Sequence, residues 1–306
     1  MRRAQQGDIM SLPWQIAFLI RRFSFGGESI QTVKMDYAIY KKPHSHLNLP
    51  PIMIMHGLNV SRSNWRRTGR FIAKRGPRAV IAVDARNHGE SGHSSEHTPK
   101  HMAADAAAFI VGHKLNRIVA LGHSMGGRAL MTLALTQPEQ VECAIFVDIT
   151  PGKLPRDVQE AWNLFEKMVE VLPTIPNELP LHEGRKFILP SFVKLVKSDL
   201  DLILIAHNLK KTESGTFAWK SNPQAILDGW EQSMCNYEKT LSGLKPYDGK
   251  TLLIAAKKTT FVTPSNIKTM KKYFPNLRVE YLDADHKVHV SQPDKFLNLV
   301  VDFTKP

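Results

Sequence analysis

The sequence predicts an α/β protein with a mostly parallel central sheet, flanking helices and a helical cap inserted late in the chain. From residue 37 onward, short apolar runs alternate with helical stretches, which is the pattern of parallel strands joined by crossover helices. Three apolar runs, at residues 51–55, 79–83 and 117–121, each end in a loop that carries polar residues. Ligands of open α/β sheets bind outside the carboxyl ends of the strands, so we expect these loops to share one rim that holds the site.

The remaining elements follow in order along the chain. A helix should begin at Pro99 with Thr98 as its N-cap, a second helix should cover residues 125–135, and a strand should cover 142–147. Roughly a hundred residues then show helical apolar spacing and no convincing strand, which predicts a helical cap at about 152–245. After the cap we expect strands at 251–256 and 278–282 and helices at 264–273 and from about 293.

The length and composition favour one globular domain, which we place at residues 36–306. No stretch reaches the roughly 20 apolar residues that span a bilayer. Only two cysteines occur, Cys143 and Cys235, so no disulfide framework is expected. The net charge of +13 comes from scattered basic residues without a nucleic-acid-binding motif, so we expect no nucleic-acid partner and leave contact with an anionic membrane surface open.

The N-terminal segment, residues 1–35, is basic and resembles a mitochondrial presequence. Its apolar residues around Ile16 are flanked by arginines, and Asp8 is the only acid before Glu28. We therefore expect a mitochondrial location, with the cytoplasm as the alternative if this segment is instead a surface helix ahead of the domain. The flanking arginines are Arg2, Arg3, Arg21 and Arg22.

The segment Gly122-His123-Ser124-Met125-Gly126 matches the nucleophile elbow, in which a serine lies on a strained turn between a strand and a helix. Glycines two residues to either side let the backbones pack closely enough to hold the hydroxyl clear of the sheet. The motif follows an apolar run at 118–121 and opens the helix predicted at 125–135, which is the context that it requires. We therefore predict that Ser124 is a catalytic nucleophile.

A serine nucleophile needs hydrogen-bond donors for the negative charge that develops on the carbonyl oxygen. The backbone N–H of Met125, at the positive end of its helix, is one candidate. The second candidate is the N–H of Leu58, which follows His56 and Gly57 at the end of an early strand. We predict that Leu58 and Met125 form the oxyanion hole and that His56 and Gly57 contact the substrate.

A nucleophilic serine also needs a general base. In proteins with a nucleophile elbow, the histidine that serves as base follows both the serine and the acid along the chain, so we expect it near the C-terminus. His286 lies in a loop after the last predicted strand, and His289 is its rival. The loop at 257–262, where the acid often lies, contains no carboxylate. We therefore predict that Asp148, at the end of the strand at 142–147, is the acid. The competing acids are Asp283 and Asp285.

With these residues assembled, the chain resembles the α/β-hydrolase family, and within it the group that contains abhydrolase domain-containing protein 11 and related bacterial esterases. The matches run from about residue 50 to the C-terminus. The most discriminating are the D-x-R-N-H-G-x-S stretch at 84–91 and Phe-Ala-Trp-Lys-Ser-Asn at 217–222. The resemblance implies a mitochondrial or bacterial-type serine esterase, thioesterase or lipase that acts on acyl esters, including diacylglycerol-like lipids, with no metal and no organic cofactor.

The sequence also departs from the pattern of that family. Asp285 stands where a glycine usually precedes the base, Lys287 where an aromatic residue usually follows it, and Val60 where a glycine is expected after the oxyanion turn. These changes keep open a rival interpretation, a non-catalytic binding or scaffold protein with the hydrolase fold. A dehalogenase or epoxide hydrolase would need a carboxylate nucleophile, and Ser124 argues against both.

Several apolar residues of the predicted cap could line a pocket for a fatty acyl chain. Apolar residues of a helical insertion also bury against one another, and the sequence leaves both roles open. The candidates are Trp162, Phe165, Phe187, Phe192 and Trp219.

Overall fold

The computed structural model describes residues 22–25, 28–42, 48–155, 158–196 and 198–306. Within them, a seven-stranded sheet has the order β11-β10-β7-β6-β4-β5-β3, with β3 antiparallel to its neighbour and the other pairs parallel. This arrangement confirms the predicted fold class. The strands are β3 (Tyr37–Tyr40), β4 (Ile52–Met55), β5 (Val80–Val83), β6 (Ile118–His123), β7 (Val141–Val147), β10 (Lys250–Ala256) and β11 (Leu277–Leu282).

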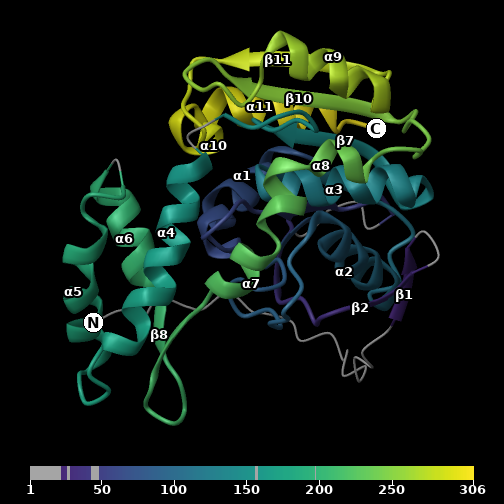
Figure 1. Ribbon diagram of the computed structural model, residues 1–306. Coiled ribbons are helices and arrows are strands. Elements are labelled where there is room, and N and C mark those ends of the chain that lie inside the picture. Colours follow the sequence, from purple (N-terminus) through teal and green to yellow (C-terminus); the bar gives the residue numbers. More distant parts are fainter. Residues whose placement is uncertain (1–21, 26–27, 43–47, 156–157, 197) are drawn as a thin grey trace, which may run out of the picture.

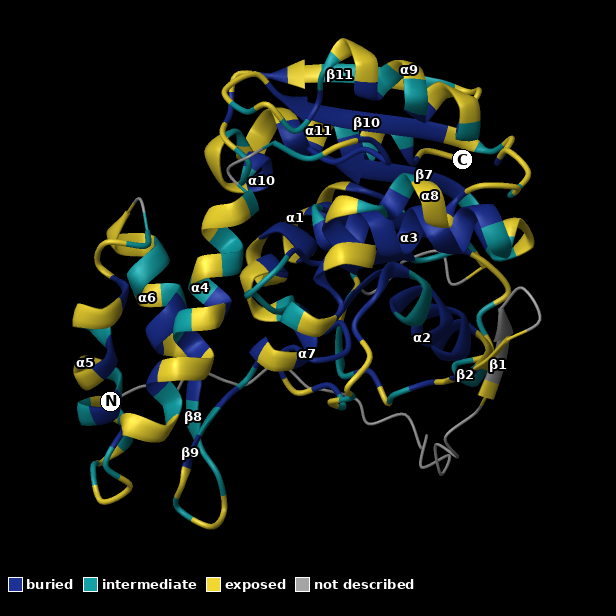
Figure 2. Cartoon of the chain, viewed as in Figure 1, coloured by how far each residue is buried: buried dark blue, intermediate teal, exposed yellow. Residues whose placement is uncertain are grey.

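Helices cover both faces of this sheet, and for that reason its central strands are apolar on both sides. Apolar residues of α2, α3 and α9 pack on one face, and those of α1 and α11 pack on the other. Figure 2 shows β7 and β10 as buried strands between these layers. The helices are α1 (Arg66–Arg75), α2 (Pro99–Gly112), α3 (Met125–Thr136), α9 (Pro264–Tyr273) and α11 (Pro293–Phe303), with shorter turns at Arg62–Trp65, Pro138–Gln140 and α10 (Val288–Ser291).

The helix boundaries follow the capping signals in the sequence. The Thr98 side chain accepts a hydrogen bond from the His101 N–H, and Pro99 occupies the first turn of α2, as predicted. Thr263 caps α9 in the same way, with Pro264 after it. These caps fix where each crossover helix leaves the rim of the sheet.

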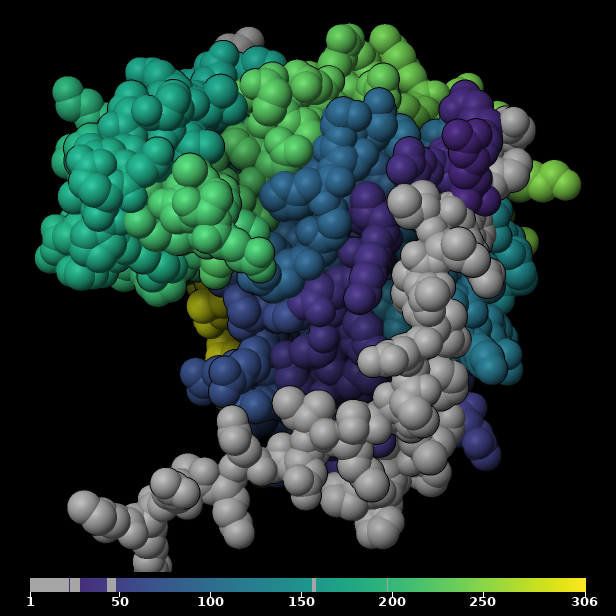
Figure 3. All heavy atoms as spheres, turned by 90° about the horizontal axis from the view of Figure 1, so that it is seen from below, coloured from purple at the N-terminus to yellow at the C-terminus, as the bar shows by residue number. Residues whose placement is uncertain are grey.

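The cap forms a second lobe beside the sheet (Figures 1 and 3). It has its own cluster of buried apolar side chains, and Leu58 and Leu154 pack against both this cluster and the main core. We predicted no strand in the cap, but it contains a short hairpin of β8 (Leu209–Lys211) and β9 (Phe217–Trp219). Strands of three residues are too short for their periodicity to be recognised in the sequence. The cap helices are α4 (Val158–Val171), α5 (Leu181–Phe192), α6 (Asp199–Asn208), α7 (Pro223–Asp228), a 3₁₀ turn at Leu172–Thr174, a π-helix at Glu231–Cys235 and α8 (Tyr237–Thr240).

The folded part of the chain begins before residue 36, the start that we predicted for the domain. A hairpin of β1 (Arg22–Phe25) and β2 (Glu28–Gln31) precedes the sheet, and Ile30 and Met35 are buried in the main core. β2 is only four residues long and buries Ile30 alone, so it carries no strand periodicity that the sequence could reveal. Residues 1–21, which carry most of the predicted presequence, lie outside the described residues. None of the helices that the structure describes is long and apolar enough to cross a membrane.

Candidate active site

Ser124 lies on the turn between β6 and α3 in a backbone conformation that is unusual for a residue with a side chain. Its φ is 52° and its ψ is −119°, and its N–H donates to the carbonyl oxygen of Val147 at 3.2 Å. The turn is possible because Gly126 packs on the neighbouring strand. A Cβ atom at Gly126 would lie 2.4 Å from the carbonyl oxygen of Met55. The elbow motif therefore has the strained geometry that exposes a nucleophile.

The two predicted oxyanion-hole residues lie beside this turn. Met125 is the first residue of α3, and Leu58 follows Gly57 at the end of β4. A Cβ atom at Gly57 would lie 3.3 Å from the Cβ atom of Ser124, so the backbone before Leu58 packs directly on the nucleophile. Among the hydrogen bonds of the described residues, neither the Leu58 N–H nor the Met125 N–H has an acceptor. Both amides are therefore free to donate to a bound oxygen atom.

His286 and Asp148 come together at the same rim, although 138 residues separate them in the sequence. The Nδ1 atom of His286 lies 2.8 Å from Oδ2 of Asp148, whose side chain is fully buried. The carboxylate also accepts hydrogen bonds from the Ala256 N–H at 2.9 Å and from the Thr259 hydroxyl at 2.9 Å. With Nδ1–H donating to Asp148, the Nε2 atom of a neutral His286 is left as a proton acceptor.

The competing acids have other partners. Oδ1 of Asp285 accepts hydrogen bonds from the Lys287 N–H and the Ser291 hydroxyl, which ties its carboxylate to the start of α10. Asp283 is exposed and pairs with Lys258 at 3.4 Å. Asp148 is thus the acid that the fold brings to the imidazole of His286.

The rival histidine, His289, is a packing residue in this structure. Its ring stacks on Trp65 with a centroid distance of 3.8 Å, and burial lowers its pKa to about 3. The neighbouring charge of His286 acts in the same direction. His289 therefore stays neutral throughout the ordinary pH range, and no hydrogen bond or ion pair among those of the described residues joins its ring to a carboxylate.

Three further residues contact His286 or Asp148 and were not predicted from the sequence. The Phe261 ring stacks on the His286 imidazole at a centroid distance of 4.1 Å. The His123 Nε2–H donates to the His286 carbonyl oxygen at 2.8 Å. Thr259 and Phe261 both lie in the loop after β10, which the sequence analysis noted only for its lack of a carboxylate. The position of that loop on the rim was the signal that could have identified them.

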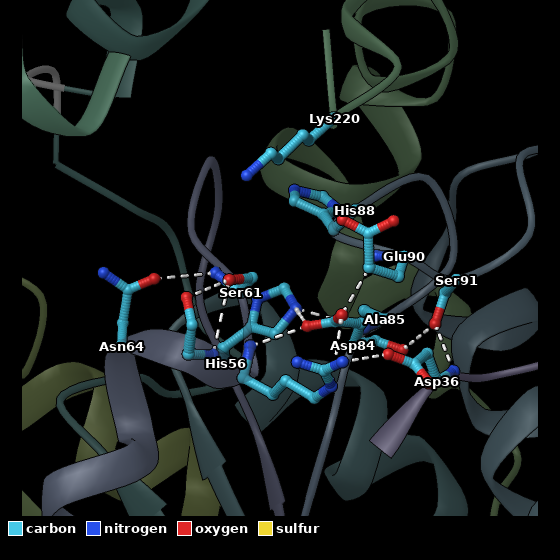
Figure 4. A network of polar contacts seen from close by, with 12 residues as sticks. Asp36, His56, Ser61, Asn64, Asp84, Ala85, His88, Glu90, Ser91 and Lys220 are labelled. Atoms are coloured by element: carbon cyan, nitrogen blue, oxygen red, sulfur yellow. Dashed lines mark hydrogen bonds and ion pairs between the residues drawn. The ribbon is translucent and has the colours of Figure 1, made fainter. Parts of the chain in front are cut away.

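His56, for which we predicted contact with the substrate, is fully buried beneath the oxyanion loop (Figure 4). Its Nδ1–H donates to the Gly57 carbonyl oxygen at 2.7 Å, and its Nε2 accepts from the Ala85 N–H at 3.1 Å. Burial lowers the pKa of His56, which keeps the ring neutral and able to accept from the amide. His56 therefore supports the loop from inside and offers no exposed surface to a substrate, whereas Gly57 remains next to the nucleophile.

The nearby carboxylate of Asp84 organises the rest of this loop cluster (Figure 4). It accepts hydrogen bonds from the Arg62 N–H at 2.6 Å and from the Glu90 N–H at 3.0 Å. His88 acts like His56, since its Nε2 accepts from the Asn59 N–H at 3.2 Å. The loops after β4 and β5 are thereby joined through buried polar side chains.

The candidate pocket residues of the cap lie mostly inside its own apolar cluster. Phe165 is fully buried, and Trp219 is nearly so, with its Nε1–H donating to the Met168 carbonyl oxygen at 2.8 Å. Trp162 is partly buried and packs edge-on against Trp230 at a centroid distance of 5.5 Å. A cavity of about 480 Å³ touches Trp219 but not Ser124, Asp148 or His286. Of the two roles that the sequence left open, the structure favours packing for Phe165 and Trp219.

Comparison with known proteins decides the family. The family model described as "alpha/beta hydrolase fold" matches residues 50–293. The chain belongs to the α/β-hydrolase family. Hydrolases of this fold carry their catalytic residues in the chain order serine, acid, histidine, and Ser124, Asp148 and His286 follow the same order.

Relatives within the α/β-hydrolase family carry more than one activity in their names. The chain is 32% identical to sn-1-specific diacylglycerol lipase ABHD11 of Mus musculus, over 83% of this chain and 81% of that protein. It is 25% identical to Ethanol acetyltransferase 1 of Cyberlindnera fabianii, over 89% of this chain and 87% of that protein. The solved structure named "Marine microorganism esterase" superposes with a TM-score of 0.74 at 23% identity, covering 89% and 100% of the two chains, and shows the shared fold.

Proposed function

We propose that this protein is a serine hydrolase that cleaves carboxylic esters or thioesters, with Ser124 as nucleophile, His286 as general base and Asp148 as the acid of the triad. The observation that carries the proposal is the 2.8 Å hydrogen bond between His286 Nδ1 and the buried Asp148 carboxylate. This bond fixes the tautomer of His286 and directs it to the rim that also holds the strained Ser124.

In the proposed reaction, His286 takes the proton of the Ser124 hydroxyl as the oxygen attacks the acyl carbonyl. The amides of Leu58 and Met125 donate to the oxyanion of the tetrahedral intermediate. His286 then gives the proton to the leaving alcohol or thiol, which departs and leaves an acyl-enzyme. A water molecule activated by His286 attacks the acyl-enzyme, and its collapse releases the acid and restores the serine.

The substrate class that we propose is an acyl lipid, such as diacylglycerol. The support comes from the name of the mouse relative, a diacylglycerol lipase, and from the partly buried apolar side chains Leu58 and Leu154, which lie between the cap cluster and the main core. Leu58, at the oxyanion loop, packs against the cap cluster as well as against the main core. An acyl group held at Ser124 would therefore lie next to apolar surface from both lobes.

A second candidate function is transfer of the acyl group to an alcohol. Ethanol acetyltransferase 1 of Cyberlindnera fabianii is a relative over most of its length, and an acyl-enzyme can be attacked by an alcohol as well as by water. The non-catalytic alternative, a binding or scaffold protein, would keep the fold without an activated serine.

A fluorophosphonate probe tests the proposal, because it labels an activated serine without requiring a particular substrate. We expect the wild-type protein to be labelled, and we expect Ser124→Ala to lose labelling and about 10³-fold or more of its ester turnover. Esters of increasing acyl length, assayed with and without ethanol, then separate hydrolysis from transfer. If Ser124→Ala kept most of the turnover, or if the wild type were not labelled, the protein would not be a Ser124-dependent hydrolase.

We also propose that residues 1–35 direct the protein to mitochondria, on the basis of their arginine-rich, acid-poor composition. A fluorescent reporter fused to this segment should be imported into mitochondria. A reporter that stays in the cytosol would contradict the proposed location and leave the enzymatic proposal unaffected.

A further inference from the structure

Arg128 lies on α3 one turn after Ser124, and its side chain is almost fully buried. Its N–H donates to the Ser124 carbonyl oxygen at 3.3 Å, so the two residues share the first turn of the helix. The guanidinium makes four hydrogen bonds, and all four acceptors are backbone carbonyl oxygens. These acceptors are Thr150 at 3.3 Å, Gly152 at 2.7 Å, Ser233 at 2.7 Å and Met234 at 3.0 Å.

The four carbonyls belong to the two segments that connect the cap to the rest of the chain. Thr150 and Gly152 follow Asp148 and lead into the cap, whereas Ser233 and Met234 lie near its end. We call these segments, residues 149–152 and 231–235, the cap stems. The second stem is a π-helix, and such wide turns occur frequently at functional sites. One side chain on the nucleophile helix thus contacts both stems.

The charge of Arg128 has no anionic partner, which makes its burial costly. The partners of its guanidinium among the described residues are all carbonyl oxygens, and burial lowers its pKa to about 10, which still leaves it charged at neutral pH. The Tyr237 ring lies 4.8 Å from its Cζ, and the Tyr237 hydroxyl donates to the Arg128 carbonyl oxygen at 2.7 Å. Carbonyl dipoles and an aromatic ring are the only groups that stabilise this buried charge. An apolar residue of similar volume could contribute more to the stability of the fold, so stability alone does not explain an arginine here.

The geometry of the guanidinium explains why an arginine, and not a lysine, can bind both cap stems. Its planar group offers five N–H donors in fixed directions, so it can bind carbonyls from two separate segments at once. A lysine offers its donors from a single nitrogen at the end of a flexible chain. The arrangement at Arg128 therefore requires arginine for its shape rather than for its charge alone.

We propose that Arg128 is a positioning residue that clamps both cap stems to the nucleophile helix and thereby sets how the cap lies over an acyl chain bound at Ser124. This inference rests on the proposed esterase function for its effect on selectivity. One hydrogen bond of the clamp goes to the carbonyl oxygen of Gly152, four residues after Asp148. It therefore also restrains the segment that follows the proposed acid of the triad.

Arg78 provides a matched control for Arg128. Its side chain is equally buried, and it donates to the carbonyl oxygens of Thr304 at 2.7 Å and Pro50 at 2.9 Å. It also pairs with Glu142 at 2.6 Å, at the start of β7 and thus at the end of the strands opposite to the rim. Replacing Arg78 with lysine disturbs a buried guanidinium that also binds backbone carbonyls, although it has a carboxylate partner, and does so without contacting the cap.

The experiment compares Arg128→Lys, Arg78→Lys and the wild type by amide hydrogen exchange and by kcat/KM for a short-chain and a long-chain acyl ester. We expect Arg128→Lys to accelerate exchange in both cap stems by about tenfold, the factor that corresponds to losing one hydrogen bond of a charged group. The ratio of long-chain to short-chain kcat/KM should fall by a similar factor, through KM for the long-chain ester. Arg78→Lys should change neither the amide exchange rates in the cap stems nor the ratio of long-chain to short-chain kcat/KM, even if it lowers the Tm.

Two results would overturn the inference. One is exchange in the stems of Arg128→Lys that matches the wild type. The other is an equal change of the long-to-short ratio in Arg128→Lys and Arg78→Lys, which would reflect general loss of stability. If Arg128→Lys does not fold, Arg128→Gln replaces it, since this change removes the buried charge and leaves a short amide that cannot reach both stems at once, and the same decision rule applies. Hydrogen exchange needs no catalysis, so a failure of the proposed esterase function would remain distinguishable from a failure of the clamp.

Discussion

The rim of the sheet and the cap are held together by different kinds of contact. At the rim, buried polar side chains are fixed by directed hydrogen bonds: Asp148 has donors from Ala256, Thr259 and His286. Inside the cap, the main contacts are between apolar side chains, as in the cluster around Phe165. Directed bonds fix atoms within a few tenths of an ångström, whereas apolar contacts tolerate changes of shape. The rim is therefore held by directed hydrogen bonds, whereas the cap is held mainly by apolar packing.

Several hydrogen bonds join the cap to the rim loops, for example from the Asn208 side chain to that of Asn59 at 2.6 Å and from the Ser233 hydroxyl to the His97 carbonyl oxygen at 2.9 Å, and the connections differ in strength. Arg128 joins the stems of the cap to α3 through a fully enclosed set of hydrogen bonds. Lys287, next to His286, pairs with Asp201 of α6 at 2.6 Å, but these two side chains are 35% and 30% exposed. Partly exposed ion pairs contribute little, so we expect the stems rather than this pair to fix the cap.

The largest expected effect is a loss of turnover when the hydrogen bonds of Asp148 at the rim are changed. Asn at position 148 keeps the size of the side chain but favours the wrong tautomer of His286, so Asp148→Asn should lower turnover by up to about 10⁴-fold. The matched controls are Asp283→Asn and Asp285→Asn, measured in the same esterase assay, and both should stay close to the wild type. A large loss in either control, with Asp148→Asn near wild type, would show that the acid lies elsewhere.

The next effect is a dependence of the free energy of unfolding on pH. It arises because several histidines of the rim loops and the core are buried in their neutral form. Burial lowers the pKa of His97 and of His289 to about 3, whereas in the unfolded chain they titrate near 6.5. As the pH falls below 6.5, the unfolded state binds more protons than the folded state, so the free energy of unfolding decreases down to a pH of about 3. Each such histidine should contribute about 1.4 kcal/mol per pH unit within this window.

Chemical denaturation at several pH values measures this dependence, with His289→Gln as the comparison. The variant should show a shallower decrease at low pH than the wild type. The cap histidines His182 and His207 are exposed and offer the control, because their replacement by Gln should leave the slope unchanged. An unchanged slope in His289→Gln would contradict the assignment of His289 as a neutral buried residue.

The smallest expected effect tests the link between Lys287 and Asp201. Lys287→Met should cost at most about 1 kcal/mol of stability and change kcat/KM by less than about fivefold, because the pair is partly exposed and screened by salt. Measurements at low and high ionic strength should converge for the wild type and the variant as salt increases. A loss of tenfold or more at both ionic strengths would mean that this ion pair, and not only the stems, positions the cap.

The sequence alone determined most of the fold and the elbow turn at Ser124, for which we propose the role of nucleophile. Strand periodicity and caps such as Thr98-Pro99 act through neighbouring residues, so they can be read locally. The same holds for Ser124, because the glycines that permit its turn lie within two residues of it. His286 and Asp148 were predicted from chain order and from the missing carboxylate at 257–262, and the fold brings their side chains together.

Only the tertiary structure decided what surrounds those residues. Whether His56 faces a substrate or the interior depends on Ala85, which is distant in the sequence, and on the packing of two loops. The contacts of Phe261 and Thr259 with His286 and Asp148 join strands that the chain order separates. Arg128 shows the reason most directly, since its four acceptors are backbone carbonyls, which every residue carries and which therefore leave no signal in the sequence.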